Sequence, residues 1–145
     1  MLPDMSLLFV YGSLKEGFPN FHVNQGRRVP GTYRTVQPYP LYLAEGVLPC
    51  LLPVPGRGQR VVGQLFEVGA AALARMDRLE KVGQPGGYAR VTIDVEASDG
   101  AGAGTIAAFV YVQQESLLAG TGPHVGPIAE YTHEHAKSLR WSGSA

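Results

Sequence analysis

The sequence has little cysteine, no excess of charge of either sign and no long hydrophobic run. Cys50 is its only cysteine, which excludes an intrachain disulfide framework and favours a reducing compartment, so we expect a cytoplasmic protein. Its 12 basic and 12 acidic side chains cancel, so net charge does not draw the chain to nucleic acid or to an anionic membrane surface. The short apolar stretch after Asp4 is neither a secretory signal nor a membrane span. We therefore expect a small-molecule ligand, no nucleic-acid or membrane partner, and an oligomeric state that the sequence leaves open.

Glycine and proline, by contrast, are abundant. The 19 glycines and 11 prolines among 145 residues imply many turns, which favours short strands joined by loops over a helix bundle. A chain of this length fits one domain with one hydrophobic core. The composition therefore predicts a single β-rich domain.

Two segments have clear periodicity. Apolar and polar residues alternate from Ala89 to Val95, which predicts a strand with one buried face. Strong helix formers fill Ala70 to Leu79, where Leu73 and Met76 lie at helical spacing from Leu79, and this predicts a helix. The other expected elements are strands at 7–10, 32–35, 39–43, 60–68 (with Gly63 as a bulge or a close-packing point) and 106–112, a loop at 49–58, a hairpin connection at 99–104 and a terminal helix at 128–139.

The first apolar run stops abruptly at Tyr11, and a glycine-containing loop follows. Gly12 allows the backbone to approach a ligand closely, and the amides of Gly12, Ser13 and Leu14 come where they could converge on an oxygen atom. An ordinary strand-to-loop turn explains the pattern equally well. The segment lacks the Lys-Ser/Thr pair of a P-loop, so ATP is not expected.

Glu80 lies at the C-terminal end of the predicted helix, one turn after Met76. Partial burial there would raise the pKa of its carboxyl group toward the range that is useful for general acid/base catalysis. The alternative is a solvated glutamate at a helix end. The neighbouring charged residues Asp77, Arg78 and Lys81 are assigned to an outer face.

The remaining reactive side chains form no recognisable site. The apolar neighbours of Cys50 disfavour a thiolate, so a small buried hydrophobic residue is expected there. The four histidines are scattered, are assigned to the surface, and have no set of partners that would complete a metal site. Ser13 lacks the Gly-x-Ser-x-Gly elbow of a serine hydrolase. Tyr88 and Arg90 follow two glycines and either border a pocket or serve packing.

Several short motifs follow one another along the chain: Val10–Lys15, Pro40-Leu41 with Leu48-Pro49, the Pro-Gly-Arg-Gly turn, Val62–Phe66, Asp77–Glu80 and Tyr88–Arg90. In this order they resemble the γ-glutamylcyclotransferase-like (AIG2-like) superfamily, and within it the γ-glutamylamine cyclotransferases. The resemblance covers about 7–112 and leaves the tail 113–145 outside. It implies an α+β fold in which a small β-barrel-like mixed sheet is combined with a few short helices.

The resemblance also implies an enzyme. In that superfamily the loop matching Tyr11–Leu14 holds the γ-glutamyl group and a glutamate matching Glu80 is the catalytic acid/base, with Tyr88 among the expected substrate-binding residues. The implied reaction is an intramolecular aminolysis that releases 5-oxoproline and a free amine such as lysine, with no cofactor and no metal. The alternatives are a non-catalytic small-molecule binding module of the same fold, or an interaction domain whose contact surface is the 49–58 loop or the terminal segment.

Overall fold

The structure, a computed structural model, describes residues 5–45, 48–99, 104–120 and 122–137. Its strands are β1 (Ser6–Val10), β2 (Arg27–Arg28), β3 (Tyr33–Thr35), β4 (Leu41–Ala44), β5 (Leu48–Leu51), β6 (Val62–Val68), β7 (Ala89–Ala97), β8 (Ile106–Val112) and β9 (His124–Ile128). Its helices are η1 (Phe21–Val23), α1 (Ala70–Leu79), α2 (Glu115–Ala119) and α3 (His133–Ala136). None of the helices in these ranges is long and apolar enough to cross a membrane.

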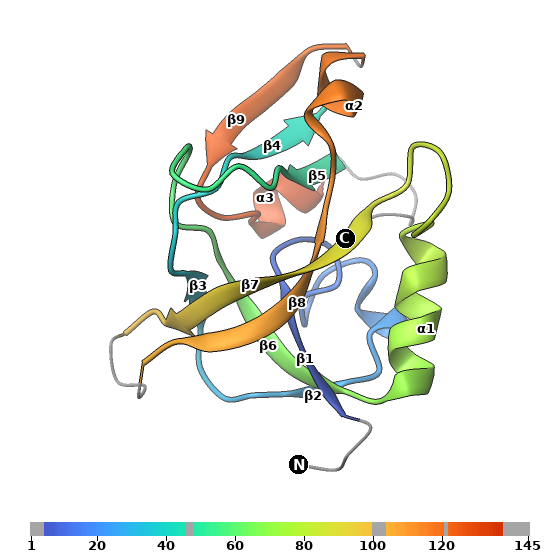
Figure 1. Cartoon of the computed structure of the whole chain (residues 1–145), viewed down its shortest axis with the longest axis vertical. Coiled ribbons are helices and arrows are strands. Elements are labelled where there is room, and N and C mark those ends of the chain that lie inside the picture. Colours follow the sequence, from blue (N-terminus) through green and yellow to red (C-terminus); the bar gives the residue numbers. More distant parts are fainter. Residues whose placement is uncertain (1–4, 46–47, 100–103, 121, 138–145) are drawn as a thin grey trace.

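Five strands close into a small barrel. The sheet runs in the order β1-β8-β7-β3-β6, and β6 pairs back to β1, which closes the ring. β1 is parallel to β8 and antiparallel to β6, so the sheet is mixed, and β2 extends it along β6. A second sheet of β5, β4 and β9 lies at one end of the barrel (Figure 1). The expected α+β fold with a barrel-like mixed sheet is therefore confirmed.

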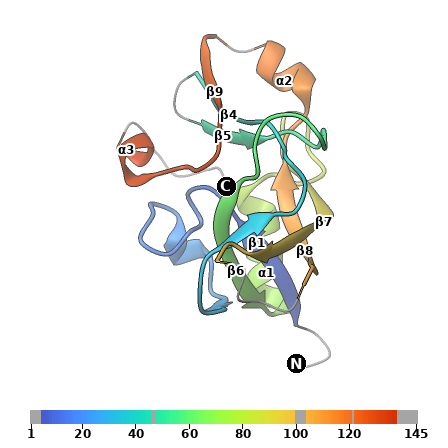
Figure 2. The same cartoon turned by 90° about the vertical axis from the view of Figure 1, so that its left-hand side faces the viewer.

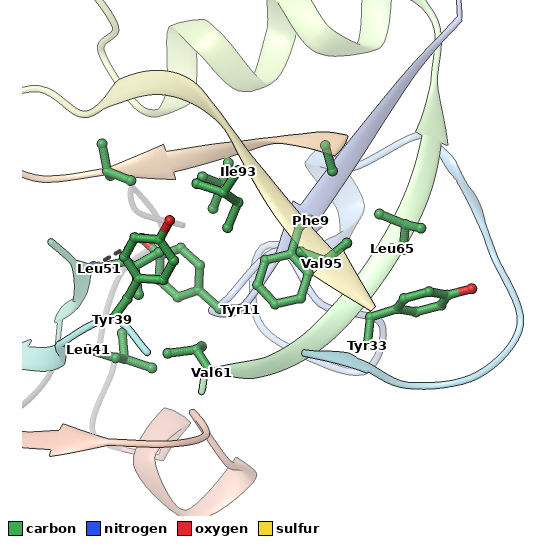
Figure 3. Packing of buried hydrophobic residues seen from close by; sticks show 13 residues of the cluster. Phe9, Tyr11, Tyr33, Tyr39, Leu41, Leu51, Val61, Leu65, Ile93 and Val95 are labelled. Carbon is green, nitrogen blue, oxygen red and sulfur yellow. Dashed lines mark hydrogen bonds between the residues drawn. The ribbon is translucent and has the colours of Figure 1, made fainter. Parts of the chain in front are cut away.

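The first strand is buried on both faces. Phe9 packs inside the barrel against residues of β3, β6 and β7, including Val95 (Figure 3). Leu8 and Val10 belong to the other core cluster, which includes Met76 of α1. A strand covered on both faces has a continuous apolar run instead of an alternating one, as this segment does.

β6 is a central strand, as expected, and Gly63 is one of its close-packing points. A Cβ atom at Gly63 would lie 2.3 Å from the carbonyl oxygen of Val10 and 2.8 Å from the Phe9 ring. Such distances admit no side chain at this position. The glycine thus allows β6 to close the barrel against β1.

Two expectations for the second half of the fold are wrong. The first three residues of the expected loop 49–58 belong to strand β5, because their apolar side chains are buried and their backbone pairs with β4. The terminal helix does not begin at residue 128, where β9 ends, but at His133 after its N-cap Thr132, and residues 138–139 of the expected span lie outside the described ranges. Most of the 99–104 connection also lies outside them.

Candidate active site

The loop that follows β1 is buried and held by two asparagines. Tyr11, Gly12, Ser13 and Leu14 all lie in the interior. The Asn20 side-chain amide donates to Ser13 Oγ at 2.8 Å, the Asn20 backbone N–H donates to the Ser13 carbonyl at 2.9 Å, and a second buried asparagine donates to the Leu14 carbonyl at 3.0 Å. The loop is therefore shaped by its own neighbours before any ligand binds.

That second asparagine is Asn24, and sequence reasoning identified neither it nor Asn20 as a functional residue. Polar residues are common in a turn-rich segment, so nothing in the pattern separates a buried asparagine from a solvated one. Only the three-dimensional contacts show that both support the loop.

Glu80 is the residue that directly follows α1, and it is 1% exposed. Its backbone N–H donates to the Met76 carbonyl, and its own carbonyl accepts the N–H of Tyr88 at 2.9 Å. This second bond brings the end of α1 next to the start of β7 and closes the intervening loop 81–87. The prediction that Glu80 is buried against the apolar body of the domain is confirmed, and the alternative of a solvated glutamate is wrong.

Hydroxyl groups and a thiol lie near enough to Glu80 to interact electrostatically with its carboxyl group. Burial raises the pKa of Tyr11 and of Tyr88 well above the usual value, and repulsion from the ionised forms of Cys50 and Glu80 raises both further. Burial likewise raises the pKa of the Cys50 thiol, with a further rise from Glu80. Burial also raises the pKa of Tyr111, and Asp77 and then Glu80 raise it further. All four groups are thus neutral near pH 7, and Glu80 lies among them.

The tyrosines of this cluster join the strands that surround Glu80. The Tyr88 hydroxyl donates to the Pro49 carbonyl at 2.8 Å and contacts the Cys50 sulfur at 3.7 Å. The Tyr11 hydroxyl donates to the Tyr111 carbonyl at 2.7 Å and accepts the N–H of the residue after Cys50 at 3.4 Å. Cys50 is a small buried residue, as expected, and it packs against Tyr88.

Asp77 corrects the assignment of the charged residues on α1. Its carboxylate accepts a hydrogen bond from the Tyr111 hydroxyl at 2.7 Å and pairs with Arg90 at 3.1 Å. Arg78 and Lys81 are exposed, as expected. Asp77 precedes Glu80 by three residues and therefore lies on the same side of the helix, which packs against the barrel.

A polar cavity of about 350 Å³ adjoins the loop between Glu80 and Tyr88. Its lining residues are Gln84, Pro85, Gly86, Gly87, Gln113, Gln114, Ser116 and Leu117. The Gln113 side chain donates to the Gly86 carbonyl at 3.1 Å and so holds the loop against the end of β8.

The histidines lie apart from this cluster. His22, His124 and His133 are exposed and His135 is half-buried, so the surface assignment is confirmed except for the partial burial of His135. Within the described ranges, no group of three or more His, Cys, Asp or Glu side chains is placed to hold a metal ion. The side chains that interact electrostatically with Glu80 are instead neutral hydroxyl groups and a thiol. Shielded from water, such a carboxyl group is suited to proton transfer.

Comparisons with known proteins show the family of this chain. The sequence matches the family described as Gamma-glutamyl cyclotransferase, AIG2-like, over residues 8–134. It is 41% identical to gamma-glutamylaminecyclotransferase of Bos taurus over 141 residues, which are 93% of this chain and 80% of that protein. It is 40% identical to gamma-glutamylaminecyclotransferase B of Danio rerio over 116 residues, 75% of this chain and 60% of the zebrafish protein, so less than two thirds of the latter is spanned.

Comparison of the fold with solved structures also finds an AIG2-like protein. The crystal structure of an AIG2-like protein from Mus musculus superposes with a TM-score of 0.75 and 30% sequence identity, covering 95% of each chain. The family match includes the loop after β1, all of α1 and the strands that close the barrel. From its sequence and its fold, the chain belongs to the gamma-glutamyl cyclotransferase, AIG2-like family.

Proposed function

We propose that this protein is a γ-glutamylamine cyclotransferase that releases 5-oxoproline and a free amine, such as lysine, from a γ-glutamyl amine. The observation that carries the proposal is the burial of Glu80 among Tyr11, Tyr88 and Cys50, which provides a carboxyl group shielded from water at the end of a rigid helix. The names of the bovine and zebrafish relatives support the same substrate class.

The reaction is an intramolecular aminolysis. The α-ammonium group of the substrate first transfers a proton to the Glu80 carboxylate, and the free amine then attacks the γ-carbonyl carbon. A new C–N bond closes the five-membered lactam, and Glu80 returns its proton to the departing nitrogen as the original amide C–N bond breaks. The second proton that the attacking nitrogen loses on becoming the lactam N–H also ends on the departing nitrogen, so the amine is released as an ammonium ion. Attacker and target belong to one molecule, so positioning removes much of the entropic barrier.

Substrate binding is assigned to the loop after β1 and to Tyr88. The backbone amides of Tyr11–Leu14 would orient the γ-glutamyl group and offset the charge that develops on the carbonyl oxygen. The bonds from Asn20 and Asn24 support this role, because a loop that is already shaped loses little entropy when the substrate binds. Tyr88 is a neutral hydroxyl group beside Glu80 and would border the bound substrate.

The test is release of 5-oxoproline, followed by mass spectrometry, from a panel of γ-glutamyl amines and γ-glutamyl amino acids. We expect turnover by the wild type and a loss of about a hundredfold or more in Glu80→Gln, which keeps the shape of the side chain and removes its acid/base function. Glu67→Gln is the matched control, because that carboxylate pairs with the exposed Arg27.

Three outcomes separate the hypotheses. If the wild type and Glu67→Gln release 5-oxoproline and Glu80→Gln does not, both the activity and the role of Glu80 are supported. Near-full activity in Glu80→Gln excludes Glu80 as the acid/base. Binding of panel compounds without any release would indicate the non-catalytic binding module.

A further inference from the structure

Lys15 is a buried lysine, and the proposed reaction does not use it. The residue is 2% exposed, although lysine is almost never buried unless it is paired. Its ammonium group donates to the backbone carbonyl of Tyr131 and lies 4.3 Å from the centre of the Phe18 ring. Burial lowers the pKa of Lys15 to about 8, while Glu130 raises it and Arg28 lowers it. Burial disfavours the charge of this ammonium group, so the group needs specific partners. Two of them, Tyr131 and Glu130, lie in the C-terminal segment 130–136.

Aromatic rings of the C-terminal segment pack against Phe18, which belongs to the loop. The ring of Phe18 stacks on His133 at a centroid distance of 4.2 Å and lies 5.7 Å from the ring of Tyr131. Tyr131 is fully buried and its ring stacks on His135. In Figure 2, α3 lies beside the loop that follows β1, in agreement with these contacts.

The local conformation of the C-terminal segment is also fixed. Thr132 and His135 form a reciprocal capping box at the start of α3, in which each side chain bonds to the backbone N–H of the other. The carbonyl that Lys15 binds belongs to Tyr131, the residue immediately before Thr132. Lys15 therefore binds a defined point of the backbone at the entrance to α3.

Neighbouring residues of the loop are thus held in two different ways. Ser13 and Leu14 are fixed by Asn20 and Asn24, which are close in sequence, whereas Lys15 is fixed by a residue 116 positions away. Removal of the Lys15 contact would leave the asparagine bonds in place. It would release only the side of the loop that faces α3.

We infer that Lys15 is a positioning residue, which fixes the loop Gly12–Asn20 against the segment Glu130–Ala136 so that the loop is preformed for its ligand. The C-terminal segment thereby becomes part of the binding architecture without touching the reacting atoms. This inference rests on the proposed function only in that the ligand is the γ-glutamyl group of the substrate. The order of the loop is a property of the protein itself and can be measured without turnover.

The first variant is Lys15→Met, which keeps an unbranched side chain of similar length and removes the donor and the charge. The matched control is Lys137→Met, the same change at an exposed lysine directly after that segment, where Nζ pairs with Glu134. Phe18→Leu is a second variant, which removes the ring contacts of a half-buried residue and is expected to fold even if Lys15→Met does not.

Two readouts are needed. Hydrogen exchange of the backbone amides of residues 12–20 should speed up by about tenfold or more in Lys15→Met and Phe18→Leu, with no change in the β6 or β7 amides. Where the wild type releases 5-oxoproline, KM should rise by about tenfold with a smaller change in kcat. Lys137→Met should match the wild type in both readouts.

The outcomes are distinguishable. Faster exchange confined to the loop supports the inference even if no γ-glutamyl compound is turned over, in which case the proposed function alone fails. Wild-type exchange and wild-type KM in folded Lys15→Met would overturn the inference and leave the proposed function untouched. Faster exchange throughout the barrel would also overturn it, because Lys15 would then contribute only to global stability.

Discussion

Buried hydroxyl groups provide much of the hydrogen bonding around Glu80. Tyr11 donates to a carbonyl of β8, and Tyr88 donates to a carbonyl of β5. A buried main-chain carbonyl group without a partner is costly, and each hydroxyl provides one with a hydrogen bond. A tyrosine at either position therefore serves packing and hydrogen bonding together.

Replacing Tyr88 by Phe tests this point at a single oxygen atom. The change leaves the ring in place but removes the donor to the Pro49 carbonyl, so the free energy of unfolding should fall by about 1–3 kcal/mol. Tyr42→Phe is the control, because the Tyr42 ring is half-buried and packs edge-on against His124. Equal unfolding free energies for the two variants, measured by urea titration, would show that the Tyr88 hydroxyl contributes nothing to stability.

Residue by residue, the sequence was most informative where the chemistry is local. Glu80 was identified from its place at a helix end and from a family resemblance, and its burial agrees. Asp77 and Lys15, by contrast, have distant partners: Lys15 bonds to a carbonyl 116 positions away, and Asp77 bonds to Tyr111. Periodicity or spacing within a short stretch of sequence cannot predict contacts between residues so far apart.

At the scale of the elements, β6 depends on a glycine. Gly63→Ala would place a methyl group 2.3 Å from the Val10 carbonyl oxygen, where β6 and β1 approach each other. Because the neighbour is backbone, it cannot move aside cheaply, and we expect a loss of about 1–3 kcal/mol or more in unfolding free energy. Thermal and urea unfolding would measure it.

The control for that experiment is Gly122→Ala. A Cβ atom at Gly122 has no neighbour within 4 Å among the described residues, so the substitution should change stability by a few tenths of a kcal/mol at most. If Gly63→Ala proved as stable as this control, the close approach of β6 to β1 would not limit the size of residue 63.

Elements with a strong local pattern were predicted well. The helix Ala70–Leu79 and the strand Ile106–Val112 have the expected bounds, and the strand that begins at Ala89 is two residues longer than expected. β5 and β9 were missed because each contains a proline and turn residues surround them, so local preference points to loop. Both pair with β4, and this tertiary pairing overrides the local preference.

At the scale of the whole molecule, pH should change stability through Lys15. The pKa of this side chain is about 8 in the folded protein and 10.5 in the unfolded chain, so between these values the unfolded chain binds more protons. The free energy of unfolding contributed by Lys15 therefore rises with pH across this window, by up to about 3 kcal/mol in total, and is flat below pH 8.

The difference in unfolding free energy between the wild type and Lys15→Met isolates this effect. The raised pKa values of the tyrosines and Cys50 lower stability at high pH, but these groups are common to both proteins and cancel in the difference. Urea unfolding at steps between pH 7 and pH 10 should show the wild type gaining stability relative to the variant as pH rises. A constant difference over that range would mean that Lys15 titrates as it does in water.

The closed order of the barrel strands also has a consequence for synthesis of the chain. β1 leaves the ribosome first, but its parallel partner at Phe109 is made about a hundred residues later. During translation the apolar residues of β1 can meet β6 and α1, yet one edge of the strand lacks its neighbour until Val112 has emerged. The nascent protein thus carries an open strand edge until β8 has been made, and this is the kind of surface on which chaperones act.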